Sequence, residues 1–259
     1  MKSKPAVWII AGTSEGRKLI KYFADKKVNL LVSVATDYGA NLIEPQSNMT
    51  VKPERMDYAA MESFIKLNEP CMVIDATHPF ATIVTATIKK ACMATGVKYL
   101  RLLRPAGDIS GCIEVNDYEE AVEFLSHVEG NIFLTTGSKT LDLFTQIPNY
   151  QARITLRILP MVSSLEKAAN LGYAPSKTIC MQGPFSTSLN VAMFKEAKAK
   201  YVVTKDSGDV GGFQEKKDAA IDAGAQLIVI KRKPGDNGGD FTSLIAEIES
   251  ILSKEGAQC

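Results

Sequence analysis

The chain has 259 residues, enough for one large domain or two smaller ones. Hydrophobic residues make up 46% of it and charged residues 23%, as in an ordinary globular protein. The 30 Lys and Arg residues nearly balance the 29 Asp and Glu residues, so the net charge of +1 offers no general field for nucleic acid or an anionic membrane.

Further function classes are disfavoured by local patterns. No apolar run approaches the roughly 20 residues of a membrane span, and residues 1–5 lead straight into a predicted strand without a signal-peptide core. We therefore expect a cytoplasmic protein with no membrane partner. The five cysteines lie far apart without a C-x-x-C pair, and the chain has two histidines, so we expect reduced thiols and no protein-bound metal.

The first predicted unit is a strand, a glycine turn and a helix. Residues 7–11 are typical of a strand buried on both faces, and Ser14 is a good N-cap for the helix that follows. The turn directs backbone N–H groups and a positive helix end at one point, which favours a phosphate. The residues that we expect to bind a nucleotide there are Gly12, Thr13, Ser14, Glu15 and Gly16. In the alternative interpretation, the two glycines only permit a tight turn and close packing, since G-x-x-x-G is looser than the dinucleotide fingerprint.

The second predicted strand, residues 28–35, leads to Asp37. In a dinucleotide fold, an acidic residue at this place binds the adenosine ribose hydroxyls and repels a 2′-phosphate. No Arg or Lys follows closely, so we predict NADH as cofactor in preference to NADPH. The alternative is that Asp37 is a solvated turn residue.

A loop of defined shape follows the apolar strand predicted at residues 72–75. Pro79 fixes its own backbone and biases His78 away from helix, at the carboxyl edge of the sheet where open α/β folds bind ligands. We predict that Thr77 and His78 belong to the site, although a lone histidine is more often structural. A strand at 49–52 and a helix at 57–67 are predicted before this loop.

The second half repeats the alternation of strands and helices, which predicts a second parallel sheet. A strand at 98–104, a short one at 113–116 and a helix at 117–127 precede a turn-rich break, so we place the domains at 1–128 and 129–259. The later predicted strands are 132–136, 152–159, 177–181, 201–204 and 226–230. The later predicted helices are 138–145, 163–171, 187–199, 214–223 and 241–252.

Three strand ends of the second half gather glycines, hydroxyls and lysines, a pattern that favours an anionic ligand. Their residues are Thr136, Gly137, Ser138 and Lys139, then Gly183, Phe185 and Ser186, then Lys205, Asp206 and Ser207. Each loop alone also fits ordinary turns, helix caps and solvated lysines.

Ordered motifs along the chain resemble the precorrin-6A reductase family of cobalamin biosynthesis. They are residues 11–17 (AGTSEGR), 75–81 (DATHPFA), 100–105 (LRLLRP), 134–139 (LTTGSK), 157–160 (RILP), 182–186 (QGPFS) and 203–208 (VTKDSG). The resemblance implies two Rossmann-like α/β domains with an active site between them. It also implies reduction of one macrocycle double bond by a nicotinamide hydride.

The resemblance further implies a tetrapyrrole substrate edged with carboxylates. On that basis Arg104, Ser138, Lys139, Ser186 and Lys205 are expected at the substrate rim, with Phe185 against the ring. The reduced nicotinamide is expected on residues 12–16, and His78 or Lys205 is expected to supply the proton. Any cobalt would belong to the substrate. Because Asp37 favours NADH, we predict the cobalt-containing ring as the substrate.

Two alternatives to this function stay open at the level of sequence. One is another Rossmann-type oxidoreductase or a methyltransferase with a smaller substrate, and the other is a non-catalytic NAD(H)-sensing module. The sequence leaves the oligomeric state undetermined.

Overall fold

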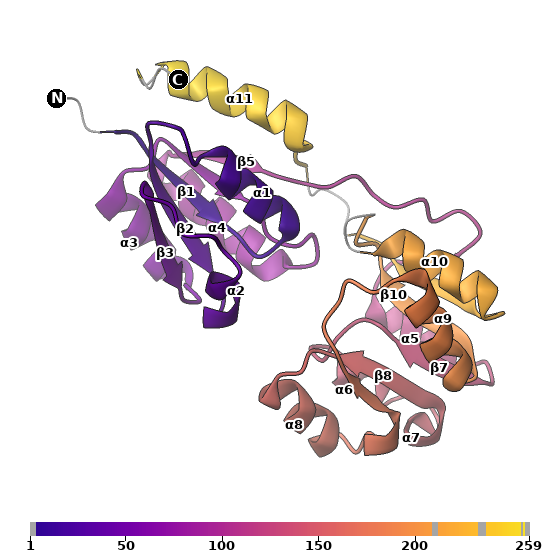
Figure 1. The fold of residues 1–259 in the computed structure, drawn as a ribbon. Helices are drawn as coiled ribbons and strands as arrows, with labels where there is room; N and C mark the ends of the chain where they lie inside the picture. The colour runs from indigo at the N-terminus through magenta and orange to yellow at the C-terminus, as the bar shows by residue number, and fades with distance from the viewer. Residues whose placement is uncertain (1–3, 209–211, 233–236, 255, 257–259) are drawn as a thin grey trace. The chain divides into compact units, whose positions relative to one another are not determined.

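The computed structural model describes residues 4–208, 212–232, 237–254 and 256. The chain divides into two compact units, each built of strands and helices (Figure 1). The first unit comprises residues 1–104 and 235–259, and the second comprises residues 105–234.

The first unit is built on a five-stranded parallel sheet with strand order β3-β2-β1-β4-β5. Its strands are β1 (Ala6–Ile10), β2 (Asn29–Val34), β3 (Met49–Pro53), β4 (Met72–Asp75) and β5 (Lys98–Arg101). The strand order reverses between β1 and β4, and a ligand is favoured outside the carboxyl ends of strands at such a point.

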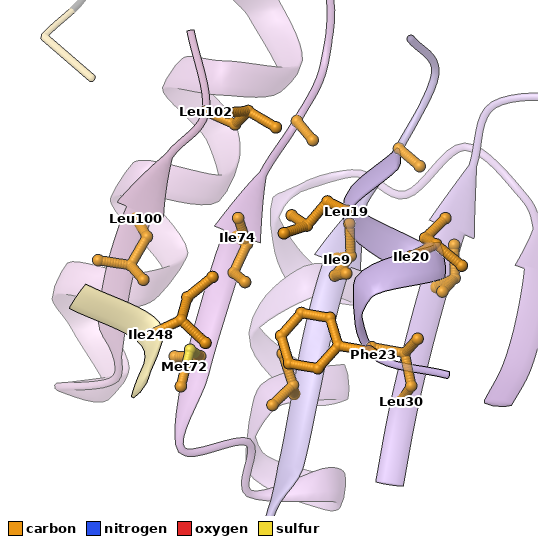
Figure 2. Close-up of a cluster of buried hydrophobic side chains, with 14 of the residues drawn as sticks. Ile9, Leu19, Ile20, Phe23, Leu30, Met72, Ile74, Leu100, Leu102 and Ile248 are labelled. Atoms are coloured by element: carbon orange, nitrogen blue, oxygen red, sulfur yellow. The ribbon is translucent and has the colours of Figure 1, made fainter. Parts of the chain in front are cut away.

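Helices cover both faces of the first sheet. They are α1 (Ser14–Tyr22), α2 (Asp37–Asn41), α3 (Tyr58–Asn68), α4 (Thr82–Thr95) and α11 (Phe241–Lys254). Alternate residues of β1 point to opposite faces, so Ile9 packs in the core with α1 and α11, while Trp8 packs in the core with α3 and α4. Figure 2 shows Phe23 and Leu19 above the strands and Ile248 from α11 beside Met72.

The second unit has a six-stranded parallel sheet of order β6-β11-β10-β7-β8-β9. Its strands are β6 (Ile113–Val115), β7 (Asn131–Leu134), β8 (Ile154–Ile158), β9 (Thr178–Cys180), β10 (Ala199–Lys205) and β11 (Gln226–Ile230). Its helices are α5 (Tyr118–Ser126), α6 (Leu141–Phe144), α7 (Tyr150–Arg153), α8 (Val162–Asn170), the 3-10 turn η1 (Pro175–Lys177), α9 (Thr187–Glu196) and α10 (Phe213–Asp222). The prediction of two α/β domains with parallel sheets is confirmed.

The division between the units differs from the boundary predicted after residue 128. The second unit begins at residue 105, because β6 pairs with β11 and belongs to the second sheet. The turn at residues 128–130 is an ordinary connection from α5 to β7. The helix α11 returns to the first unit, where Leu244, Ile248 and Leu252 fill the core.

Local differences from the predicted elements are small. The N-cap of α1 is Thr13 and not Ser14, since the Thr13 hydroxyl accepts the hydrogen bond of the Gly16 amide. Asp37 begins the short helix α2, which sequence periodicity did not reveal. The strand predicted at 98–104 ends at Arg101, after which Leu102 forms an isolated bridge with Gly239.

Candidate functional site

The loops after β1 and β4 meet at the strand-order reversal of the first sheet. Thr13 Oγ1 donates a hydrogen bond of 2.9 Å to the Ala76 carbonyl and accepts one of 3.0 Å from the Gly16 amide. A Cβ on Gly16 would lie 3.4 Å from the Ala76 Cβ, so this glycine brings α1 close to the second loop. Gly12 is exposed, has a φ of +155° and has open space around its Cα. The edge therefore offers accessible backbone beside a helix N-terminus, as a diphosphate requires.

Glu15 links this glycine loop to the end of the first unit's sheet. One carboxylate oxygen, Oε2, lies 2.8 Å from Arg104 Nη2 and accepts a hydrogen bond of 3.1 Å from Ser14 Oγ. The other oxygen, Oε1, is buried without a hydrogen-bond partner among the described residues. The structure thus places Arg104, predicted at the substrate rim, in the first unit beside the predicted nucleotide loop.

A buried ion pair supports the loop after β4. Arg101 Nη1 lies 2.9 Å from Asp75 Oδ1, and both side chains are essentially inaccessible to solvent. The same Nη1 donates to the Thr77 carbonyl at 3.0 Å, while the Thr77 hydroxyl donates to Asp75 Oδ1 at 2.7 Å. Tyr99 OH donates to the second carboxylate oxygen at 3.1 Å. The Thr77 hydroxyl therefore fixes the loop rather than standing open to a ligand.

His78 lies half-buried directly after this network. Its Nδ1 accepts a hydrogen bond of 3.2 Å from the Phe80 amide, so in the neutral ring the proton is on Nε2. That tautomer gives the loop a donor at the carboxyl edge of the sheet.

Asp37 is exposed at the start of α2, immediately beyond the carboxyl end of β2. The cap of this helix is the neighbouring Thr36, whose Oγ1 accepts the Gly39 amide at 3.1 Å. Within the described residues Asp37 makes no ion pair, which leaves its carboxylate available to a hydroxyl-bearing ligand.

The second unit contains a cavity of about 310 Å³ at the carboxyl ends of β7, β8 and β9. The lining residues are Thr135, Thr136, Gly137, Arg157, Ile158, Leu159, Met181, Gly183, Pro184, Phe185, Asn190, Gly212 and Lys216. Four of the predicted site residues are therefore brought together here: Thr136, Gly137, Gly183 and Phe185.

Arg157 is one of two buried cations among the residues that line this cavity. Its Nη1 donates to Asn190 Oδ1 at 2.8 Å, and its guanidinium carbon lies 3.8 Å from the centroid of the Phe185 ring. Within the described residues no carboxylate lies at ion-pair distance from it. Burial lowers the pKa of the guanidinium to about 10, so the side chain stays charged at neutral pH.

Two lysines of the second unit are also shielded from solvent, with Lys216 buried and Lys205 half-buried. Burial, and then the charge of Arg157, lower the pKa of Lys216 to about 8, against the opposite effect of Glu215. Burial, and then the charge of Lys139, lower the pKa of Lys205 to about 8. Both side chains are thus poised to lose or gain a proton close to physiological pH.

The other candidates of the second unit lie outside the cavity lining. Ser138 Oγ is 2.9 Å from Ser164 Oγ, and Ser186 is the N-cap of α9. Lys139 is exposed. Asp206 is buried and is held by its own unit, since it accepts from the Gly107 amide at 3.0 Å and pairs with Arg232 at 3.1 Å. Ser207 follows it in the same buried loop.

Among the described residues no three His, Cys, Asp or Glu side chains are grouped closely enough to hold a metal ion. No helix in the described part of the chain is long and apolar enough to cross a bilayer.

Comparison with known proteins decides the family. Residues 6–252 match the model of the precorrin-6x reductase family CbiJ/CobK. The chain belongs to this family. A relative named cobalt-precorrin-6A reductase from Methanothermobacter thermautotrophicus is 34% identical, over 89% of this chain and 78% of the relative. A relative of the same name from Priestia megaterium is 31% identical, over 96% of this chain and 98% of the relative.

A solved structure agrees with the fold. The protein titled CobK precorrin-6A reductase matches with a TM-score of 0.74 at 23% identity and covers 98% of each chain. The predicted resemblance is confirmed, and the chain is an oxidoreductase. Family membership removes the alternatives of a methyltransferase and of a sensing module.

Arg157, Asn190 and Lys216 of this reductase were not predicted as site residues. A signal for Arg157 was present, because a charged residue inside the apolar run at 154–158 must be buried with a partner or face a ligand. Asn190 and Lys216 lie on helices whose rotation sequence alone left undetermined, so nothing in the sequence placed them beside Arg157.

Proposed function

We propose that this protein is a cobalt-precorrin-6A reductase of cobalamin biosynthesis, which uses NADH to reduce one double bond of a carboxylated macrocycle. The observation that carries the proposal is the family match over residues 6–252, together with relatives named for this reaction that are more than 30% identical. The proposal assigns the coenzyme to the first unit and the macrocycle to the second.

The first unit fits a dinucleotide by its own chemistry. The exposed backbone at Gly12 and the N-terminus of α1 suit a diphosphate, and Thr13 ties the two loops together. The buried Oε1 of Glu15 has no donor among the described residues and can accept a hydrogen bond from an amide or hydroxyl of the ligand. A reduced nicotinamide bound at this edge supplies the hydride.

Asp37 supports NADH in preference to NADPH. Its exposed carboxylate follows β2, where it can accept hydrogen bonds from ribose hydroxyls. A 2′-phosphate at the same place would face a like charge.

Reduction of a carbon–carbon double bond also needs a proton on the second carbon. His78 can donate from Nε2, and Lys205 can donate because its pKa of about 8 keeps much of the side chain protonated at neutral pH. We propose these two residues as the candidate acids. Hydride transfer depends otherwise on the positions of donor and acceptor carbons, for which the protein needs no covalent nucleophile.

The test is anaerobic oxidation of NADH, followed by its absorbance, with cobalt-precorrin-6A as acceptor. The assay is repeated with NADPH and with the metal-free ring. Turnover fastest with NADH and the cobalt ring is the expected result. Absence of oxidation with every combination would refute the reductase proposal, while a preference for NADPH or the metal-free ring would refute only that part.

A further inference from the structure

Arg157 holds a charge inside the second unit that no described carboxylate neutralises. The side chain is 5% exposed and lines the cavity. Its acceptors within the described residues are Asn190 Oδ1 at 2.8 Å and Met193 Sδ at 3.6 Å, both reached from Nη1. The donors on Nε and Nη2 have no acceptor there. A guanidinium presents its donors as a planar fork, which matches the two oxygens of a carboxylate.

A second observation in the same cavity is independent of Arg157. Thr136 is 5% exposed, lines the cavity and has a buried Oγ1 without a hydrogen-bond partner among the described residues. A buried hydroxyl is normally satisfied, so an unsatisfied one on a residue that lines an open cavity points to a ligand oxygen. Lys216, 9% exposed, brings a second cation to the same cavity. Glu215 is the carboxylate that acts on Lys216, so the two buried cations exceed it by one positive charge, and this excess and the unsatisfied hydroxyl favour an anion in the cavity.

The volume of the cavity and the apolar residues at its rim indicate the kind of molecule that carries the anionic group. About 310 Å³ is at the lower limit for pockets that hold a small molecule, too small for a whole macrocycle but sufficient for a carboxylate arm. Leu159 and Met181 line the same cavity and are 49% and 42% exposed. An apolar rim around a cationic interior suits a flat apolar ring whose carboxylate substituent enters the cavity.

We propose that Arg157, Thr136 and Lys216 form a subsite for one acetate or propionate arm of the tetrapyrrole, while Leu159 and Met181 contact the face of the ring. Arg157 binds the two carboxylate oxygens through its free donors, and Thr136 donates its hydroxyl proton to one of them. This inference rests on the proposed function for the identity of the ring, but not for the presence of an anion site.

The first test measures binding and catalysis in Arg157→Lys and Arg157→Met. The binding probe is a stable porphyrin with acetate and propionate groups on every pyrrole, titrated against the full-length protein by fluorescence quenching. Loss of a charge-assisted pair is expected to weaken porphyrin binding and to raise KM for the macrocycle by about 10- to 100-fold, with kcat changed less than about threefold. The fully methylated porphyrin ester should bind the wild type and Arg157→Met equally.

Thr136→Val keeps the test valid if the arginine variants fold poorly. Valine has nearly the same shape, and the hydroxyl that it removes has no hydrogen-bond partner among the described residues. We expect an unchanged or higher melting temperature together with about fivefold weaker porphyrin binding. A purely structural role of Thr136 would not produce this combination.

The matched control is Lys195→Gln, which removes one positive charge from an exposed position of α9 in the same unit. Its porphyrin affinity should equal that of the wild type. Unchanged affinity and KM in both Arg157→Lys and Thr136→Val would overturn the subsite. If the wild type fails to reduce cobalt-precorrin-6A but still binds the porphyrin through Arg157, the proposed function fails and the anion site stands.

Discussion

The two units present chemically different carboxyl edges, although both are parallel α/β sheets. In the first unit, arginines near the edge are paired with carboxylates, as in Arg101 with Asp75 and Arg104 with Glu15. In the second unit, Arg157 is buried without a described carboxylate, and burial depresses the pKa of Lys205 and Lys216. Arg101 and Arg104 of the first edge are thus neutralised by carboxylates of their own unit, whereas Arg157 of the second edge has no such partner among the described residues.

This difference predicts that removing a buried arginine destabilises the first unit much more than the second. Arg101→Met leaves the carboxylate of Asp75 in the protein interior, where it keeps hydrogen bonds from Thr77 and Tyr99 but loses its countercharge. The free energy of unfolding should fall by about 3–5 kcal/mol. Arg157→Met strands no carboxylate, so we expect a loss below about 1.5 kcal/mol, from the Asn190 carbonyl that loses its donor. Urea unfolding of both variants measures the contrast.

The double variant Asp75→Asn with Arg101→Met is the control for this experiment. Because it removes both charges, it should be less destabilised than Arg101→Met alone. Equal losses in Arg101→Met and Arg157→Met would show that the two edges do not differ in the way inferred from their ion pairs.

Raising the pH should weaken ligand binding at the carboxyl edge of the second unit and leave binding at the edge of the first unit nearly unchanged. The ammonium groups of Lys205 and Lys216 lose their protons as the pH passes about 8, so porphyrin affinity should fall by about tenfold from about pH 7.5 to about 9.5. NADH affinity should change less than about threefold, because the guanidinium and carboxylate groups of the first edge are side-chain types that keep their charge in this range.

The unliganded protein should show the opposite trend in stability. Both lysines have a folded-state pKa below the ordinary value of 10.5, so the unfolded chain binds more protons between these limits. The free energy of unfolding attributable to them therefore rises with pH from about 8 upward. Lys216→Met should reduce both trends, and an unaltered pH profile in that variant would remove Lys216 from the explanation.

The coenzyme preference tests the ligand assigned to the first unit. Asp37→Ser removes the carboxylate that we expect to select NADH, and the ratio of NADH to NADPH affinity should fall by about tenfold. Asp25→Ser is the matched control, since Asp25 is exposed before β2, at the amino end of the same strand. An identical ratio in both variants would return Asp37 to the role of a solvated helix-start residue.

Apolar periodicity was sufficient to predict the strands and the class of both sheets. The run at 72–75 is buried on both faces, as its composition required. Periodicity could not predict which unit β6 and α11 join, since both assignments depend on contacts between residues far apart in the sequence. β6 pairs with β11, and α11 packs in the core of the first unit. The compact units therefore divide at residue 105 and not at the predicted residue 129.

The sequence indicated which glycine loops lie together, but not how the charged side chains are paired. Gly137 and Gly183 lie in the cavity, where glycine loops were expected at strand ends. Arg104 stays a predicted residue of the substrate rim, and its ion pair with Glu15 was not foreseen, because a sequence shows which charges exist and not which of them pair. Arg157 was quoted only within a motif, although its charge within an apolar strand was the stronger indication.

The smallest predicted effect concerns Ser186, a candidate substrate residue that the structure shows as a helix cap. Its exposed hydroxyl accepts the Leu189 amide at 3.3 Å and lies outside the cavity lining, whereas Thr13 in the first unit is buried and bonds two loops at once. Ser186→Ala should cost about 0.5–1 kcal/mol of unfolding free energy and change porphyrin affinity less than twofold, while Thr13→Ala should cost about 2 kcal/mol. Thermal unfolding and porphyrin titration of the two variants distinguish a cap from a contact. A tenfold loss of affinity in Ser186→Ala at unchanged stability would extend the carboxylate subsite to α9, because a residue that only caps a helix has no means of altering ligand binding without altering the helix.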